Sequence, residues 1–340
     1  MINVGLIGAG RIGRVHAEHL AHRIPEANVV AVADIIAEAA EKLAADFQIP
    51  AAFTDHRAIM EDETIEAVVI CSSTDTHAQM IEAAAAAGKH IFCEKPIALD
   101  LARIDQALEA VSRAGVKLQV GFNRRFDPSF RRVRELVASG QIGDPHILRI
   151  TSRDPAPPPI EYVKVSGGIF LDMTIHDFDM ARFLMGSEVE EIFAAGAVLV
   201  DSEIGRVGDI DTAVITLRFA NGALGTIDNS RKAVYGYDQR VEVFGSAGVA
   251  VVSNRTPDNA VLSDAGGVHS ALPLYFFLER YAEAYVEELR TFIQCILEDK
   301  TPPVTGVDGR VPVVMGYAAR KSYEERRPVR LSEIEQGATE

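Results

Sequence analysis

The first 120 residues alternate between short apolar runs and longer amphipathic stretches. The apolar runs predict strands at 4–7, 29–33, 67–71, 90–93 and 117–121, and the stretches between them predict helices, among them 36–47, 79–87 and 101–114. Strands that are apolar throughout, rather than at alternate positions, are typical of a parallel sheet covered by helices on both faces. The pattern therefore predicts an N-terminal α/β domain of the Rossmann type, with a doubly wound parallel sheet.

From about residue 145 the pattern changes to alternating apolar and polar residues, which is typical of strands with one buried face. Strands are predicted at 146–152, 210–219, 224–229 and 240–244, with the hairpin signal Asn221-Gly222 between two of them. Helices are predicted at 170–184 and 275–297. This half predicts an α+β domain with an open antiparallel sheet. We expect domains at 1–122 and 123–340, with the C-terminal helix able to pack back on the first domain.

Composition narrows the class of protein. The chain has 340 residues and a formal net charge of −15, which disfavours a surface that binds nucleic acid or anionic membranes. No apolar run approaches the roughly 20 residues of a membrane span, and no leader precedes the first strand. Three widely spaced cysteines without a Cys-x-x-Cys pair are expected to be reduced core residues. We therefore expect a cytoplasmic protein with neither a membrane nor a nucleic-acid partner.

A glycine-rich loop is the first candidate for chemistry. The segment Gly8-Ala-Gly10-Arg-Ile-Gly13 follows a predicted strand and begins a predicted helix, which is the context of a dinucleotide-binding fingerprint. Gly8 allows the tight turn, Gly10 lets the backbone approach a pyrophosphate, and Gly13 lets the helix pack closely on the strand. Asp34 ends the next strand, where a carboxylate accepts from ribose hydroxyls and repels a 2′-phosphate. These residues predict NAD rather than NADP as the cofactor.

Ser72, Ser73 and Thr74 end a further predicted strand. Ligands of doubly wound sheets bind at the carboxyl ends of the strands. The three small hydroxyl residues are therefore candidates to line the nicotinamide ribose, and the alternative is that they are ordinary turn residues.

A carboxylate and an imidazole lie one predicted helical turn apart, at Asp172 and His176, and Asp179 falls near the same stripe. An imidazole suits proton removal from an alcohol near neutral pH, and a neighbouring carboxylate can hold its tautomer. The alternative is a solvated stripe with an ordinary charge pair. A metal site would need further imidazole or thiolate ligands, so we expect no metal.

Lys95 follows Glu94 at the end of a predicted strand and precedes Pro96, which can fix the turn. A lysine at the carboxyl end of a strand can donate to a substrate oxygen and stabilise a developing alkoxide. Taken alone, Lys95 is equally compatible with a surface lysine. Together with the nucleotide loop and the carboxylate–imidazole pair, it suggests hydride transfer to or from an alcohol.

In this order along the chain, the glycine loop, Asp34, Glu94-Lys95-Pro96 and the Asp172/His176 helix resemble the Gfo/Idh/MocA oxidoreductases, and most of all their myo-inositol 2-dehydrogenases. The resemblance covers nearly the whole chain. It implies NAD-dependent oxidation of a ring hydroxyl of myo-inositol to 2-keto-myo-inositol (scyllo-inosose). It also implies a small polyol as substrate and a homotetramer that pairs through the antiparallel sheet.

The resemblance further implies roles for individual residues. His176 would be the acid/base, Asp172 would orient it, and Lys95 would hydrogen-bond the reacting oxygen. The implied substrate-binding set is Lys95, Arg125, Asp154, Asp172, His176, Asp179 and Tyr235. The implied cofactor-binding set is Gly8, Gly10, Arg11, Ile12, Gly13, Asp34, Ser72, Ser73, Thr74, His77, Glu94 and Lys95. Two alternatives stay open: a dehydrogenase for another inositol isomer or a pyranose sugar, and a non-catalytic NAD-sensing regulator.

Overall fold

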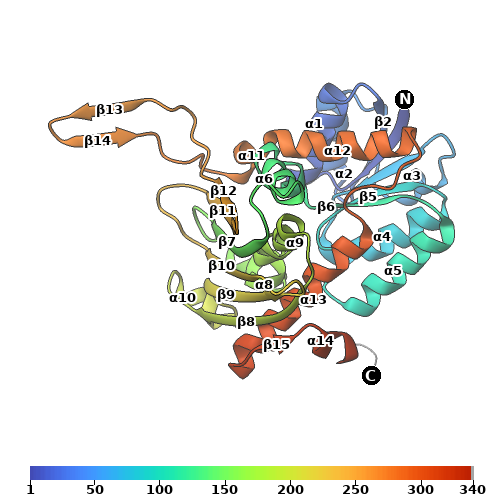
Figure 1. Ribbon diagram of the computed structural model, residues 1–340. Coiled ribbons are helices and arrows are strands. Elements are labelled where there is room, and N and C mark those ends of the chain that lie inside the picture. The colour runs from blue at the N-terminus through green and yellow to red at the C-terminus, as the bar shows by residue number, and fades with distance from the viewer. Residues whose placement is uncertain (338–340) are drawn as a thin grey trace. The chain divides into compact units, whose positions relative to one another are not determined.

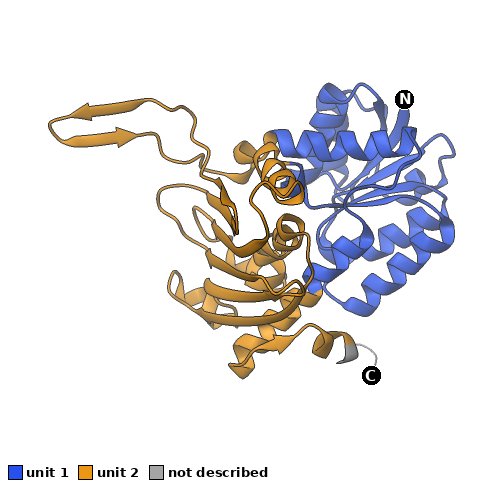
Figure 2. Cartoon of the chain, in the orientation of Figure 1, with its two compact units in different colours: residues 1–126, 283–313 blue, residues 127–282, 314–340 orange. Residues whose placement is uncertain are grey.

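The computed structural model describes residues 1–337 and divides the chain into two compact units, coloured separately in Figure 2. Unit 1 comprises residues 1–126 and 283–313, and unit 2 comprises residues 127–282 and the chain from 314 onward. The chain therefore changes units three times, where the sequence suggested one boundary at 122/123 and a helix packing back.

Unit 1 is built on a six-stranded parallel sheet in the order β3-β2-β1-β4-β5-β6. This is the Rossmann strand order, and it confirms the predicted doubly wound sheet. Its strands are β1 (Ile2–Ile7), β2 (Ala27–Ala33), β3 (Ala51–Phe53), β4 (Ala67–Ile70), β5 (His90–Glu94) and β6 (Leu118–Gly121). Its helical segments are α1 (Arg11–Arg23), α2 (Ala37–Phe47), α3 (Arg57–Glu61), α4 (Thr74–Ala86), α5 (Leu101–Ala114), η1 (Asn123–Phe126) and nearly all of α12 (Ala282–Leu297).

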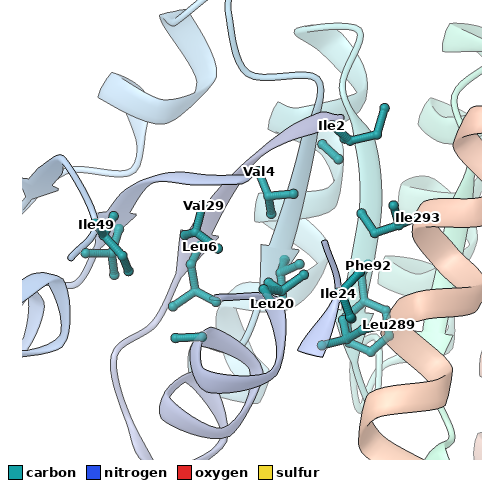
Figure 3. Packing of buried hydrophobic residues seen from close by; sticks show 14 of the residues in the cluster. Ile2, Val4, Leu6, Leu20, Ile24, Val29, Ile49, Phe92, Leu289 and Ile293 are labelled. Atoms are coloured by element: carbon teal, nitrogen blue, oxygen red, sulfur yellow. The ribbon is translucent and has the colours of Figure 1, made fainter. Parts of the chain in front are cut away.

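The edge strand β3 was not predicted, because three residues carry too little periodicity to stand out. The apolar core of unit 1 also contains a segment that is distant in sequence. Leu289 and Ile293 of α12 pack beside Phe92 of β5, on the face that also carries Leu20 and Ile24 (Figure 3). The predicted apolar stripe of this late helix therefore completes the first unit rather than the second.

Unit 2 is built on a seven-stranded sheet in the order β12-β11-β7-β10-β9-β8-β15. Its strands are β7 (Pro145–Arg153), β8 (Val189–Ala197), β9 (Thr212–Phe219), β10 (Leu224–Ser230), β11 (Asp238–Gly245), β12 (Gly248–Val252) and β15 (Val329–Arg330). The sheet was predicted to be antiparallel, but β7 and β10 run parallel. A long crossover of helices and two strands joins them, whereas antiparallel neighbours can be joined by a short turn.

The helices of unit 2 are α6 (Pro128–Ala138), α7 (Ile160–Val163), α8 (Ile169–Asp172), α9 (Thr174–Met185), α10 (Ser202–Arg206), α11 (Phe277–Arg280) and α14 (Ser332–Gly337), and α13 (Gly306–Glu325) spans both units. Two helices predicted as single elements are each divided. The segment 170–184 breaks at Met173 into α8 and α9, and 275–297 breaks at Tyr281 into α11 and α12.

A two-stranded hairpin, β13 (Val261–Asp264) and β14 (Gly267–Ser270), projects from the rest of unit 2 (Figure 1). All eight of its strand residues are exposed, including Val261, Leu262 and Val268. Across residues 1–337, no helix combines the length and the apolar character needed to cross a membrane.

Candidate active site

The glycine loop connects β1 to α1 in unit 1, and each of its glycines meets a different constraint. Gly8 has a φ of 101°, and a Cβ there would lie 2.6 Å from the backbone of Cys71. A Cβ at Gly13 would lie 1.9 Å from the carbonyl oxygen of Gly8. Around Gly10, in contrast, no described atom outside its two chain neighbours lies within 4 Å of the Cβ position. Gly8 and Gly13 are therefore required by the fold. At Gly10 the missing side chain leaves space in which a ligand can approach the backbone closely.

Asp34, which directly follows β2, stabilises this loop through hydrogen bonds. Its carboxylate accepts hydrogen bonds from the backbone N–H of Ala9 at 2.7 Å and of Ile36 at 2.9 Å. Each carboxylate oxygen keeps a further lone pair for a ribose hydroxyl. The next two side chains, Ile35 and Ile36, are exposed and apolar, so neither offers a cation for a 2′-phosphate. Arg11 and Ile12 are the first two residues of α1.

The ends of β4 and β5 are tied together by His77. Its buried ring places Nδ1 2.8 Å from the Pro96 carbonyl oxygen and Nε2 2.9 Å from the Ser72 carbonyl oxygen. Ser73 is the N-cap of α4 and Thr74 its first residue, so the hydroxyl residues lie at a helix N-terminus, where backbone N–H groups favour anions.

Lys95 directly follows β5 and is half-buried, and the Lys95–Pro96 peptide is cis. Arg125, also in unit 1, donates to Asp308 at 2.9 Å. Burial of Asp308 opposes ionisation, but Arg125 and Thr305 outweigh it and lower the pKa of that carboxyl. Arg125 is therefore held in a fixed orientation by a group near the start of α13.

In unit 2, Asp172 is engaged on both oxygens. Tyr162 Oη donates to Oδ1 and Arg231 Nη1 donates to Oδ2, each at 2.8 Å. The Arg231 side chain is 2% exposed, and its guanidinium also lies 3.9 Å from Asp154 and 4.0 Å from Asp209. Burial opposes the charged form of Arg231, but the three carboxylates raise its pKa. A buried cation thus orients the two carboxylates that were predicted to bind substrate, Asp154 and Asp172.

His176 lies on the first turn of α9 and is half-buried, between residues that are fully enclosed. Thr174 Oγ1 donates to Asn229 Oδ1 at 2.6 Å, and Asn229 Nδ2 donates to Asp177 Oδ2 at 2.8 Å. These bonds fix the first turn of α9 against β10 on both sides of His176. The imidazole is therefore carried on an immobilised turn, which is what a precise proton transfer requires.

The two remaining predicted substrate residues differ in their accessibility. Tyr235 is half-buried, and its hydroxyl donates to Asp238 at 2.6 Å and accepts from Arg153 at 3.3 Å. Asp179 is fully buried on α9. Residues 155–165 contain the helical turn α7, which supplies Tyr162.

Comparison with known proteins gives the class of the chain. Residues 2–122 match the model of the oxidoreductase family with an NAD-binding Rossmann fold, GFO_IDH_MocA, and residues 130–251 match the GFO/IDH/MocA C-terminal domain. The chain belongs to the Gfo/Idh/MocA oxidoreductase family. Membership confirms the predicted family, the NAD-binding Rossmann domain and an oxidoreductase as the class of enzyme.

Among its Gfo/Idh/MocA relatives is the myo-inositol 2-dehydrogenase of Thermotoga maritima, 53% identical over 98% of this chain and 99% of that protein. A myo-inositol dehydrogenase structure from Corynebacterium glutamicum has a TM-score of 0.92 at 40% identity, covering 97% of this chain and 99% of the other. A scyllo-inositol dehydrogenase structure from Lactobacillus casei, with bound NAD(H) and scyllo-inositol, has a TM-score of 0.91 at 29% identity, covering 98% and 99%.

Three side chains around Asp172 and Asp154 were missed by sequence reasoning: Tyr162, Asp209 and Arg231. Arg231 lies 59 residues from Asp172 along the chain, and a single arginine after a strand carries no local signal. Asn229, Ser230 and Arg231, at the end of β10, could have been singled out only as polar residues that end a predicted strand, as Ser72 to Thr74 were.

Proposed function

We propose that this oxidoreductase oxidises a ring hydroxyl of myo-inositol to 2-keto-myo-inositol with NAD as the acceptor. The observation that carries the proposal is the group of polar side chains fixed around α8 and α9, where His176 is held on an anchored turn and Asp172 and Asp154 are oriented by Arg231. A ring of hydroxyls needs several fixed acceptors and donors for recognition. The relatives named inositol dehydrogenases support the same substrate class.

The chemistry follows from removing a hydride and a proton from one carbinol. When bound, NAD⁺ supplies the hydride acceptor. We assign His176 as the base that takes the hydroxyl proton as the carbonyl forms, and Asp172 as the group that orients it. Lys95 donates to the reacting oxygen and stabilises its developing negative charge. Arg125, Asp179 and Tyr235 complete the proposed polyol-binding set.

The residues proposed to bind the cofactor lie in the glycine loop and at the carboxyl ends of strands β2, β4 and β5. We propose that the pyrophosphate lies beside Gly10, where a Cβ would meet no neighbouring side chain, and against the backbone N–H groups of the first residues of α1. We propose that Asp34 accepts from the ribose hydroxyls. The proposed cofactor set also includes residues at or near the carboxyl ends of β4 and β5, namely Ser72, Ser73, Thr74, His77 and Glu94.

The test is NADH formation at 340 nm with myo-inositol, scyllo-inositol and D-glucose, each with NAD and NADP. Turnover of myo-inositol with NAD above the other pairs is the expected result. Preference for scyllo-inositol, as in the Lactobacillus casei neighbour's bound ligand, would retain the chemistry and change the isomer. Binding of NADH without turnover of any polyol would refute the proposed activity and favour a regulator.

We also propose that the protein is a cytoplasmic homotetramer that associates through the sheet of unit 2. The outward-facing positions of that sheet carry exposed apolar side chains, namely Phe193, Val214, Leu224, Phe244, Val249 and Val251. A patch of this kind marks an interaction surface, and identical subunits can cover it reciprocally. Light scattering after size exclusion should give four chains, and the double variant Val214→Arg/Val251→Arg should give smaller species.

A further inference from the structure

Unit 1 contains a buried polar cluster formed by His16 of α1, Glu94 of β5 and Glu288 of α12. His16 Nε2 lies 2.7 Å from Glu94 Oε1, and the imidazole is packed edge-on against Phe92 and Tyr285. One carboxylate oxygen of Glu288 lies within 4.8 Å of a ring nitrogen of His16 and of a carboxylate oxygen of Glu94. The cluster thus joins three elements inside an otherwise apolar layer.

Glu288 is the unexplained member of this cluster. It is fully buried, and neither carboxylate oxygen has a hydrogen-bond partner among the described residues. Its backbone carbonyl accepts from Gln119 Nε2 at 2.7 Å, which fixes α12 at this residue. An ionised carboxylate without a partner is strongly disfavoured in such a site. Burial raises the pKa of Glu288 well above its usual range, and the nearby Glu94 raises it further.

A carboxyl that holds a proton is a hydrogen-bond donor, and the Glu94 carboxylate, within 4.8 Å, is an acceptor for it. A small rotation of the side chain or one bridging water spans the remaining separation.

The residue types of this cluster would also suit a metal ion. However, ligand atoms around a tetrahedral ion stand about 3.3 Å apart, whereas His16 and Glu94 approach to 2.7 Å, a hydrogen-bond distance.

We propose that Glu288 is a positioning residue that presents a carboxyl proton to Glu94 and, with His16, fixes the Glu94 side chain and the Lys95-Pro96 turn that follows it. The Glu94 carboxyl group lies over the backbone of Gly121, where an added Cβ would stand 3.1 Å from it. His16 belongs to the helix that begins at the glycine loop. The network therefore couples the cofactor loop to Lys95 within one unit, and its link to catalysis rests on the function proposed above.

The titratable groups that face Glu288 come from three elements or their ends. They are His16 from α1, Cys71 after β4, and Glu94 from β5, with Cys93 next to Glu94. Burial, and then negative charge nearby, raises the pKa of both thiols, so neither supplies a competing anion near neutral pH. When the pH rises far enough, ionisation of Glu288 places a second negative charge beside Glu94.

The sign of the effect on stability follows from this shift. Between the ordinary pKa of 4.5 and the raised value, the folded protein holds a proton that the unfolded chain releases. Stability is therefore lost as the pH rises through that window. The variant Glu288→Gln keeps a neutral donor of the same shape at every pH. The Tm of Glu288→Gln minus that of the wild type should become more positive from pH 5 to pH 9.

The experiment compares wild type, Glu288→Gln and the control Glu287→Gln, which makes the same change at a half-exposed neighbour paired with Arg290. Tm and NADH affinity are measured from pH 5 to 9 without polyol, so they test the network even if the substrate assignment fails. With substrate, Glu288→Gln should keep kcat/KM within three-fold at pH 7 and extend activity to higher pH. Glu288→Leu, which lacks the donor, should lose at least ten-fold in kcat/KM.

Three results would overturn the proposal. One is a Tm difference for Glu288→Gln that does not grow with pH, or that Glu287→Gln reproduces. Another is a loss of more than ten-fold in NADH affinity or in kcat/KM for Glu288→Gln, since the ionised form would then be the working one. The third is one equivalent of metal in the wild-type protein that is absent from Glu288→Gln.

Discussion

Gly13 offers a direct test of how the fold builds the cofactor loop. In Gly13→Ala, the new methyl group would stand 1.9 Å from the Gly8 carbonyl oxygen and 3.0 Å from the Gly8 carbonyl carbon. Both atoms are backbone, so no side-chain rotation relieves the contact. Either the loop or α1 has to move by about 1 Å, in a region packed at interior density.

The magnitude can be worked from two opposing effects. Overpacking in an interior costs about 1–3 kcal/mol, and a rigid backbone partner places this case near ~3 kcal/mol. Alanine gains back ~1 kcal/mol over glycine as a helix former. A net loss of about 2 kcal/mol corresponds to a Tm lower by roughly 4–8 °C for a domain of this size. NADH affinity should fall with it, because the displaced loop is the proposed pyrophosphate site.

Gly10→Ala is the matched control, since its Cβ meets no described atom within 4 Å beyond the chain neighbours and its φ of −71° suits alanine. Its Tm should change by no more than a few degrees, while NADH affinity, followed by fluorescence titration, should fall at least ten-fold. Calorimetry of both variants beside the wild type separates fold from binding. Wild-type Tm and affinity in Gly13→Ala would refute the packing argument, and wild-type affinity in Gly10→Ala would place the pyrophosphate elsewhere.

Asp34→Ser should raise the ratio of kcat/KM with NADP to that with NAD at least ten-fold, because it removes the carboxylate that repels a 2′-phosphate; an unchanged ratio would contradict this. His176→Ala should lower kcat about 10²–10⁴-fold while NADH affinity stays constant, and a wild-type rate would exclude it as the base. Arg231→Met leaves Asp172, whose side chain is only 11% exposed, without its cation, so urea unfolding should show a loss of about 3–5 kcal/mol. A stability close to wild type would show that the ion pair adds little.

A large part of the fold could be predicted from the local pattern of apolar and polar residues. Apolar runs followed by amphipathic stretches predicted five of the strands in the unit 1 sheet, and the glycine spacing predicted the loop between β1 and α1. These features depend on neighbours within about one element, so the sequence contains them directly. The break at Met173 was missed because the polar spacing of Asp172 and His176 fits a continuous helix equally well.

Contacts between residues that are far apart along the chain could not be predicted from the sequence. Arg231 pairs with Asp172, Glu288 lies within 4.8 Å of Glu94, and β7 pairs with β10 in parallel. In each case the partners lie tens of residues or more apart, and no periodicity relates them.

The sequence by itself determined the class of domain, the cofactor loop and which residue types are available for proton transfer, because backbone propensity and hydrophobic spacing are local properties. Only the tertiary structure decided which carboxylates are oriented by a buried arginine and which helix completes the first unit. Burial and charge pairing depend on the surroundings that the whole fold creates, and a residue type becomes a functional group only in those surroundings.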